Sequence, residues 1–332
     1  MRSWLAVAAG LAAGAAVERL VVRKPWREDP YRYEGFGSER GEPHWVRADD
    51  GTHLYAEVHP APPGAPTVVI AHGFCLTQDS WHFQRKALRG RARLVLWDQR
   101  GHGSSERGPA QNTTVDQLGR DMNSVIEALT DGPLNLVGHS MGGMTVMSLA
   151  GQFPEVVRDR VTGVGLVSTS SGDLSMDFAR LPAPVRSRLE AGISAHQPGR
   201  VPLASLLEQV RRTDLNYALT RRGSFGSQAP VSLNDFMVRM VNGTTMETVL
   251  DFLPTLMAHD KTDALKVLQD VPAFITCGEL DVLTPPSHTH RIAGELPAAQ
   301  TTVLPQTGHM IQLERPEHVT KEIERIAFTD RP

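Results

Sequence analysis

The chain has 332 residues, of which 40% are hydrophobic and 21% charged, a composition typical of a globular protein with one large α/β domain or two smaller ones. Its net charge of −3 gives no electrostatic attraction for nucleic acid. The two cysteines, Cys75 and Cys277, are too few for a disulfide framework and lack metal-ligand spacing. We therefore expect no nucleic-acid partner, no metal and no other cofactor.

The amino terminus departs from this composition. Residues 3–17 carry no charge, are dominated by Ala and Gly, and have basic residues on both sides. Extended to residue 22, the stretch reaches the roughly 20 residues that a membrane span requires. We predict that residues 1–24 form a hydrophobic segment that associates with a membrane through residues 3–22, with the rest of the chain on the cytoplasmic side because basic residues follow. Two alternatives stay open: a cleaved signal peptide of a secreted protein, or a helix of a soluble cytoplasmic protein.

Residues 25–43 are rich in proline and charge, and we predict that they form a linker. Two alternating stretches follow, residues 44–48 and 52–58, separated by Asp49-Asp50-Gly51. Asp-Gly between such stretches is typical of a β-hairpin.

Apolar runs of strand length then alternate with amphipathic helices. Strands buried on both faces and separated by helices of ten or more residues are typical of βαβ units in a parallel sheet. The predicted strands of this part are residues 67–73, 93–99, 134–140 and 161–170, and the predicted helices are residues 80–88, 115–129 and 141–153.

The alternation breaks between residues 171 and 266, where helices are predicted at 204–219, 232–241 and 245–256. It resumes with strands at 272–278 and 301–305 and helices at 287–296 and 317–328. We predict a doubly wound, mostly parallel sheet of eight strands with a helical cap inserted after the sixth strand. The core would comprise residues 44–170 and 267–332, and the cap residues 171–266.

The sequence Gly138-His139-Ser140-Met141-Gly142 lies between a predicted strand and a predicted helix. In that context G-x-S-x-G forms a nucleophile elbow, in which a serine on a sharp turn is exposed at the end of the strand. Ser140 is therefore the candidate nucleophile, and it needs a base to take its proton.

Of the 13 histidines, His309 follows the last predicted strand and is the candidate base. A carboxylate must orient that base. Asp281, directly after the preceding strand, is the candidate, Asp173 the alternative, and Glu279 a carboxylate of the same loop. We interpret the other histidines considered as structural residues within turns, namely His72, His102 and His139, or as solvated ones, namely His288, His290 and His318.

The reaction also needs two donors for an oxyanion. The backbone N–H of Met141 lies next to the nucleophile, and the loop after residues 67–73 offers the N–H of Phe74. These are the candidate oxyanion-hole donors.

Several segments together resemble the α/β-hydrolase superfamily, in the family's order and over residues 43–328: "VVIAHGF", "WDQRGHGSS", "LVGHSMGG", "GELDVLTPP" and "TGHMIQLERPE". The resemblance implies Ser140, Asp281 and His309 as a catalytic triad, with Phe74 and Met141 as the oxyanion hole. The "SMGG" elbow is similar to those of serine esterases, monoacylglycerol-type lipases and cofactor-free haloperoxidases.

The resemblance predicts a serine hydrolase that cleaves carboxylic esters through an acyl-enzyme. Lipophilic small-molecule substrates are indicated by the possible membrane segment and by the apolar faces of the predicted cap helices, where Phe236 and Met240, or Val249 and Leu253, lie four residues apart. One alternative is a haloperoxidase or perhydrolase reaction, or C–C bond hydrolysis, on the same triad. Another is a non-catalytic, membrane-tethered binding module. The oligomeric state stays open.

Overall fold

The computed structural model describes residues 29–174, 214–226 and 229–328. The predicted membrane segment, residues 1–24, lies outside the described residues, as does part of the predicted cap. Within the described ranges, no helix combines the length and the apolar character that crossing a membrane requires.

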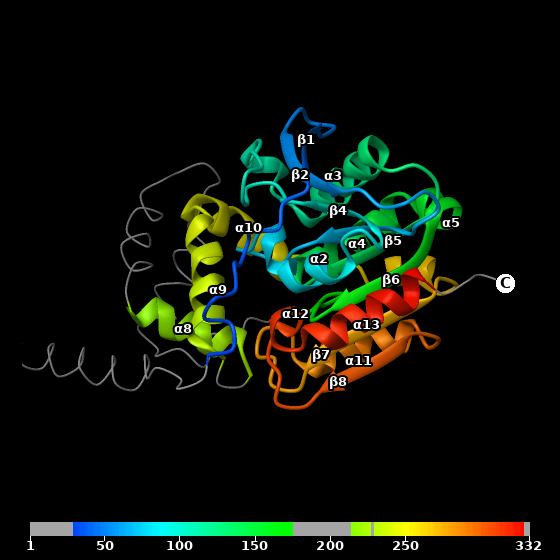
Figure 1. The fold of residues 1–332 in the computed structure, drawn as a ribbon. Coiled ribbons are helices and arrows are strands. Elements are labelled where there is room, and N and C mark those ends of the chain that lie inside the picture. The colour runs from blue at the N-terminus through cyan, green and yellow to red at the C-terminus, as the bar shows by residue number, and fades with distance from the viewer. Residues whose placement is uncertain (1–28, 175–213, 227–228, 329–332) are drawn as a thin grey trace, which may run out of the picture.

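One eight-stranded sheet runs through the molecule in the order β1-β2-β4-β3-β5-β6-β7-β8 (Figure 1). β2 pairs antiparallel with both β1 and β4, and all the other pairings are parallel. The predicted sheet is thus confirmed. Its strands are β1 (Glu42–Arg47), β2 (His53–His59), β3 (Thr67–Ala71), β4 (Arg93–Trp97), β5 (Leu134–His139), β6 (Val161–Val167), β7 (Ala273–Gly278) and β8 (Gln300–Leu304).

The predicted hairpin joins β1 to β2. Arg47 pairs with His53, and Gly51 in the turn has a φ of 89°, a left-handed conformation that glycine adopts without a Cβ clash. The Asp-Gly signal therefore located the turn correctly.

Helices cover both faces of the sheet (Figure 1). On β3, Val69 and Ala71 pack into one layer, whereas Val68 and Ile70 pack into the other. Because β3 is buried on both faces, its sequence is a continuous apolar run rather than an alternating one. The first layer holds α3 (Val115–Leu129), α4 (Met141–Gln152), α5 (Pro154–Arg160) and α11 (Pro286–Glu295), and the second holds α2 (His82–Leu88), α12 (Ile311–Glu314) and α13 (Pro316–Ala327).

Helix α5 was not predicted. Pro154 occupies its first turn, where the missing N–H costs no intrahelical hydrogen bond, and the preceding Phe153 has a φ of −131° that ends α4. Short 3-10 helices also occur at η1 (Gln78–Trp81), η2 (Ala110–Asn112) and η4 (Asp263–Leu268).

Within the described residues between β6 and β7, three α-helices precede η4, and we call them the cap helices: α8 (Asp214–Ser224), α9 (Val231–Gly243) and α10 (Met246–Ala258). α9 and α10 agree with the predicted helices at 232–241 and 245–256. The helix predicted at 204–219 falls partly outside the described residues, and α8 continues to Ser224. Figure 1 shows α8 and α9 to one side of the sheet.

The described part of the predicted linker packs against the cap helices. Asp29 accepts hydrogen bonds from the backbone N–H and the hydroxyl of Ser232, at 2.9 and 2.8 Å. The ring of Phe36 stacks on that of Phe236, with centroids 4.5 Å apart. Residues 29–36 therefore contribute contacts that hold α9 in place.

Candidate active site

Ser140 occupies a sharp turn between β5 and α4. Its φ of 53° and ψ of −118° are strained for a residue with a side chain, and the surrounding hydrogen bonds hold this conformation. The Ser140 N–H donates to the carbonyl of Val167 at 2.9 Å, and the Ser140 carbonyl accepts from the Thr169 hydroxyl at 2.7 Å. The sequence pattern of an elbow thus corresponds to an elbow in the backbone.

Two glycines allow α4 to lie close to β5 and to the end of β3. A methyl group on Gly138 would lie 2.3 Å from the Gly142 carbonyl oxygen, and one on Gly142 would lie 2.4 Å from the Ala71 carbonyl oxygen. Both distances are far below van der Waals contact, so a side chain at either position would push the backbone apart.

Gly142→Ala is therefore expected to lower the free energy of unfolding by about 3 kcal/mol, the upper end of overpacking costs. Gly294→Ala is the control, because Gly294 lies in α11 with open space around its Cα, and alanine there favours the helix by up to about 1 kcal/mol. Urea unfolding of both variants measures the difference. Equal stability of the two would contradict the steric argument.

Asp281 and His309 form a buried hydrogen-bonded pair. Asp281 follows β7 and His309 follows β8, and His309 Nδ1 lies 2.8 Å from Asp281 Oδ2. Asp281 also accepts hydrogen bonds from the backbone N–H groups of Leu283 and Thr284 at Oδ1, both at 2.9 Å, and from the Thr284 hydroxyl at Oδ2. Burial alone would raise the pKa of Asp281, but His309 and these donors outweigh it and lower the pKa, so Asp281 stays a carboxylate.

The residue beside the elbow serine contacts His309 directly. Because the His309 carbonyl can only accept, His139 Nε2 must donate the hydrogen bond of 2.9 Å that joins them. The two imidazole rings are tilted, with centroids 4.8 Å apart. The fold thus brings residues 139–140, Asp281 and His309 together at the carboxyl ends of β5, β7 and β8.

The two predicted oxyanion donors also lie at this edge. Met141 begins α4, so its N–H has no acceptor within the helix. Phe74 lies in the loop after β3, and a methyl group on the preceding Gly73 would lie only 3.1 Å from Ser140 Cβ. Both donor positions are therefore next to the elbow serine.

The loop that contains Phe74 is held by a histidine. His102 Nε2 accepts from the N–H of Cys75 at 3.1 Å, while His102 Nδ1 donates to the carbonyl of Arg100 at 2.9 Å. Cys75 has a φ of 58°, so the loop turns sharply just after Phe74. His102 is a structural histidine, as its position in a glycine-rich turn predicted.

Buried neutral histidines near the site make stability fall with falling pH. Burial lowers the pKa of His139 to about 3, helped by His309, and burial lowers that of His102 to about 4. Burial also holds the pKa of His72 well below its usual value. Unfolded histidine titrates near pH 6.5, so below that pH the unfolded chain binds more protons.

We therefore expect the free energy of unfolding to drop by about 2 kcal/mol per histidine between pH 7.5 and pH 5 for His102 and His139, at 1.36 kcal/mol per pH unit below 6.5. Burial raises the pKa of Asp98 to about 6, and its protonation in the folded state offsets about 1 kcal/mol of that loss. Urea unfolding at the two pH values measures the sum. A free energy that is unchanged or larger at pH 5 would contradict it.

The other candidates lie elsewhere. The Asp173 side chain is 81% exposed and forms an ion pair with Arg291, whereas the acid hydrogen-bonded to His309 is Asp281. The Glu279 carboxylate accepts from the backbone of residue 306. His290 is exposed, as predicted. The prediction that His288 and His318 are solvated is wrong, because both are half-buried. His288 forms a hydrogen bond with the Ser170 hydroxyl, and His318 forms one with the Thr276 hydroxyl.

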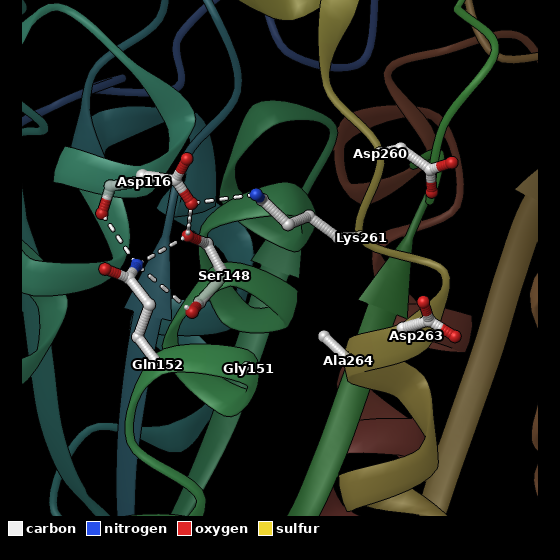
Figure 2. A pocket seen from close by; sticks show the side chains of 8 residues that line it. All are labelled: Asp116, Ser148, Gly151, Gln152, Asp260, Lys261, Asp263 and Ala264. Atoms are coloured by element: carbon white, nitrogen blue, oxygen red, sulfur yellow. Dashed lines mark hydrogen bonds and ion pairs between the residues drawn. The ribbon is translucent and has the colours of Figure 1, made fainter.

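A surface recess of about 420 Å³ lies away from this site, lined by residues of α3, α4, η4 and the segment before η4 (Figure 2). Lys261 Nζ lies 2.8 Å from a carboxylate oxygen of Asp116, and the side-chain amide of Gln152 donates to the Asp116 carbonyl. Because its polar groups bond to one another and no candidate residue lines it, we give this recess no part in the chemistry. In the described part of the chain, no group of three or more His, Cys, Asp or Glu could hold a metal ion.

Known proteins with related sequences and structures include several hydrolases. The chain is 26% identical over 290 residues to the dihydrolipoyllysine-residue acetyltransferase component of an acetoin cleaving system from Pseudomonas putida, covering 87% of this chain and 71% of that protein. It is 25% identical over 256 residues to an sn-1-specific diacylglycerol lipase from Mus musculus, covering 76% of this chain and 78% of that protein.

Solved structures show the same fold at low sequence identity. An esterase from Exiguobacterium antarcticum has a TM-score of 0.70 at 20% identity, covering 86% of this chain and 99% of that one. A bromoperoxidase from Bacillus anthracis has a TM-score of 0.67 at 19% identity, covering 86% and 100%. The family model described as alpha/beta hydrolase fold matches residues 66–316. The chain is therefore a member of the α/β-hydrolase family.

Proposed function

We propose that the protein is a serine hydrolase that cleaves carboxylic esters of lipophilic small molecules. The observation that supports this most is the pair formed by Asp281 and His309, at 2.8 Å, beside a serine held at a φ of 53°. Since His309 Nδ1 donates to the carboxylate, its Nε2 carries a lone pair and can accept the proton of Ser140.

The proposed reaction proceeds through an acyl-enzyme. Ser140 Oγ attacks the ester carbonyl as His309 Nε2 takes its proton, and the N–H groups of Phe74 and Met141 stabilise the resulting oxyanion. The tetrahedral intermediate collapses, the alcohol leaves with the proton from His309, and Ser140 stays acylated. Water then attacks the acyl group with His309 again as base, which releases the carboxylic acid and restores the serine.

The proposed lipophilic preference is supported by the side chains around the oxyanion donors. Phe74 and Met141 belong to an apolar cluster that includes Phe252 and Leu256 of the cap helix α10. The mouse relative named a diacylglycerol lipase acts, by its name, on an ester of this kind. The predicted association of residues 3–22 with a membrane stays a prediction, since they lie outside the described residues.

Hydrolysis of p-nitrophenyl esters of increasing acyl length tests the proposal. We expect turnover above the spontaneous rate, and kcat/KM that rises by up to about fourfold per methylene while the added groups are buried, since each is worth about 0.8 kcal/mol. A flat profile would contradict the lipophilic preference. Absence of hydrolysis would overturn the esterase proposal. Peroxide-dependent bromination would then favour a haloperoxidase, and C–C cleavage of a vinylogous diketone would favour a C–C hydrolase. If none of these reactions occurs, a binding module is favoured.

A further inference from the structure

The loop that carries His309 packs directly on the end of cap helix α8. The backbone N–H of Met310 donates to the carbonyl of Ser224, the last residue of α8, at 2.9 Å. The side chains of Phe225 and Met310 lie in one buried apolar cluster. Residues 224–226 of the chain are thus in contact with the residues that flank the proposed base.

Three glycines allow three backbone segments to stack here. A methyl group on Gly226 would lie 2.4 Å from the nitrogen of Gly308, and one on Gly308 would lie 2.3 Å from the nitrogen of Gly226. On the other side, a methyl group on Gly278, at the end of β7, would lie 2.2 Å from the carbonyl oxygen of Thr307. The loop before His309 therefore packs tightly between the end of β7 and residues 224–226, and the three glycine positions leave no space for a side chain.

The Glu314 carboxylate joins the segment at Gly226 to the segment at Gly308. Glu314 Oε1 accepts from the N–H of Gly308 at 2.7 Å, and Glu314 Oε2 accepts from the N–H of Gly226 at 3.0 Å. Each of the two carboxylate oxygens of Glu314 therefore holds one backbone N–H, one from each segment. Glu314 thus fixes the residue before His309 to the cap.

The loop at residues 307–310 also contacts Asp281 and His139. His309 bonds to Asp281 through its ring, and its carbonyl accepts from His139. A displacement of the cap segment would therefore move the imidazole relative to its two partners. Misplacement of a catalytic group by about 1 Å can cost about a hundredfold in rate.

We propose that Glu314 and cap residues 224–226 are positioning elements for His309, so that the cap sets the geometry of the proposed base. This inference rests on the proposed function. Glu314 does not touch the reacting atoms and acts through the loop at residues 307–310.

Two variants, each with a matched control, test the inference in the full-length protein. Gly226→Ala inserts a methyl group against the His309 loop, whereas Gly223→Ala, in the last turn of α8, meets open space. Glu314→Gln keeps the shape of the side chain but can accept from only one of the two N–H groups, whereas Glu317→Gln changes an exposed glutamate three residues later. The substrate is p-nitrophenyl acetate, because its short acyl group presents little apolar surface for binding.

We expect Gly226→Ala and Glu314→Gln to lower kcat by about 10- to 100-fold with KM within about threefold of the wild type, because the base and not substrate binding is disturbed. kcat is expressed per active site, titrated with a fluorophosphonate, so that a partly unfolded preparation does not count as a slow enzyme. Both controls should stay within about twofold of the wild type.

If the wild type hydrolyses the ester, and the folded variants have the same kcat as their controls, the inference is overturned and the proposed function is left intact. If Gly226→Ala does not fold, Glu314→Gln decides alone. A wild type that neither hydrolyses the ester nor reacts with the fluorophosphonate would overturn the proposed function, and the inference with it.

Discussion

Ser140→Ala is expected to lower kcat for p-nitrophenyl butyrate by about a million-fold, as loss of the nucleophile does in serine proteases. The hydroxyl is the proposed nucleophile, and without it neither the acyl-enzyme nor the proton transfer to His309 can occur. The remaining rate would come from water held near the oxyanion donors. Steady-state kinetics at saturating ester measure the loss.

Ser170→Ala is the control for this prediction. The Ser170 hydroxyl lies 2.8 Å from His288 Nδ1 and also donates to the Gly172 carbonyl. Ser170 and His288 are therefore a second serine and histidine in contact, which could be mistaken for the nucleophile and its base. Ser170 is fully buried, however, and its hydroxyl closes a local turn. We expect its removal to change kcat by less than about threefold, because this hydroxyl is not part of the proposed reacting unit. A large loss here, with Ser140→Ala still active, would place the nucleophile at residue 170.

Asp281→Asn is expected to lower kcat by about ten-thousand-fold, as the equivalent change does in serine proteases. The structure gives the reason. Oδ1 is held by the N–H groups of Leu283 and Thr284, so the amide oxygen would keep that place and the NH₂ group would face His309. His309 Nδ1 must then accept instead of donate, which puts the proton on Nε2 and leaves no lone pair for Ser140.

Asp173→Asn is the matched control, because Asp173 is the other acid that the sequence allowed. Its carboxylate is exposed and paired with Arg291, so the change should leave kcat within about twofold. Thermal unfolding of both variants checks that the fold persists. A loss that follows Asp173 instead of Asp281 would show that His309 is oriented from the end of β6.

Much of this arrangement is predictable from the sequence because its signals are local. The strands that form the middle of the sheet are continuous apolar runs, and the elbow combines a strand, a serine between glycines and a helix within about twenty residues. The order of the strands fixes the edge at which the loops after β5, β7 and β8 meet. This places Ser140, Asp281 and His309 together without knowledge of any side-chain contact.

Other features depend on contacts that no local pattern encodes. The bonds from Glu314 to Gly226 and Gly308 join segments separated by some eighty residues, and each glycine in isolation is typical of any turn. The choice between Asp173 and Asp281 likewise depends on burial: one is exposed to solvent and the other is enclosed beside His309. The pairing of His288 with Ser170 could not be expected from a helix start that looked solvated.

The most direct test of the proposed nucleophile is the site at which a fluorophosphonate attaches to the native protein. Intact-mass spectrometry should show a single adduct, and peptide mapping should place it on Ser140, with no adduct on the Ser140→Ala variant. Denatured protein, in which Asp281 and His309 no longer lie beside the serine, should not react. An adduct on another residue, or equal labelling of native and denatured protein, would contradict the account.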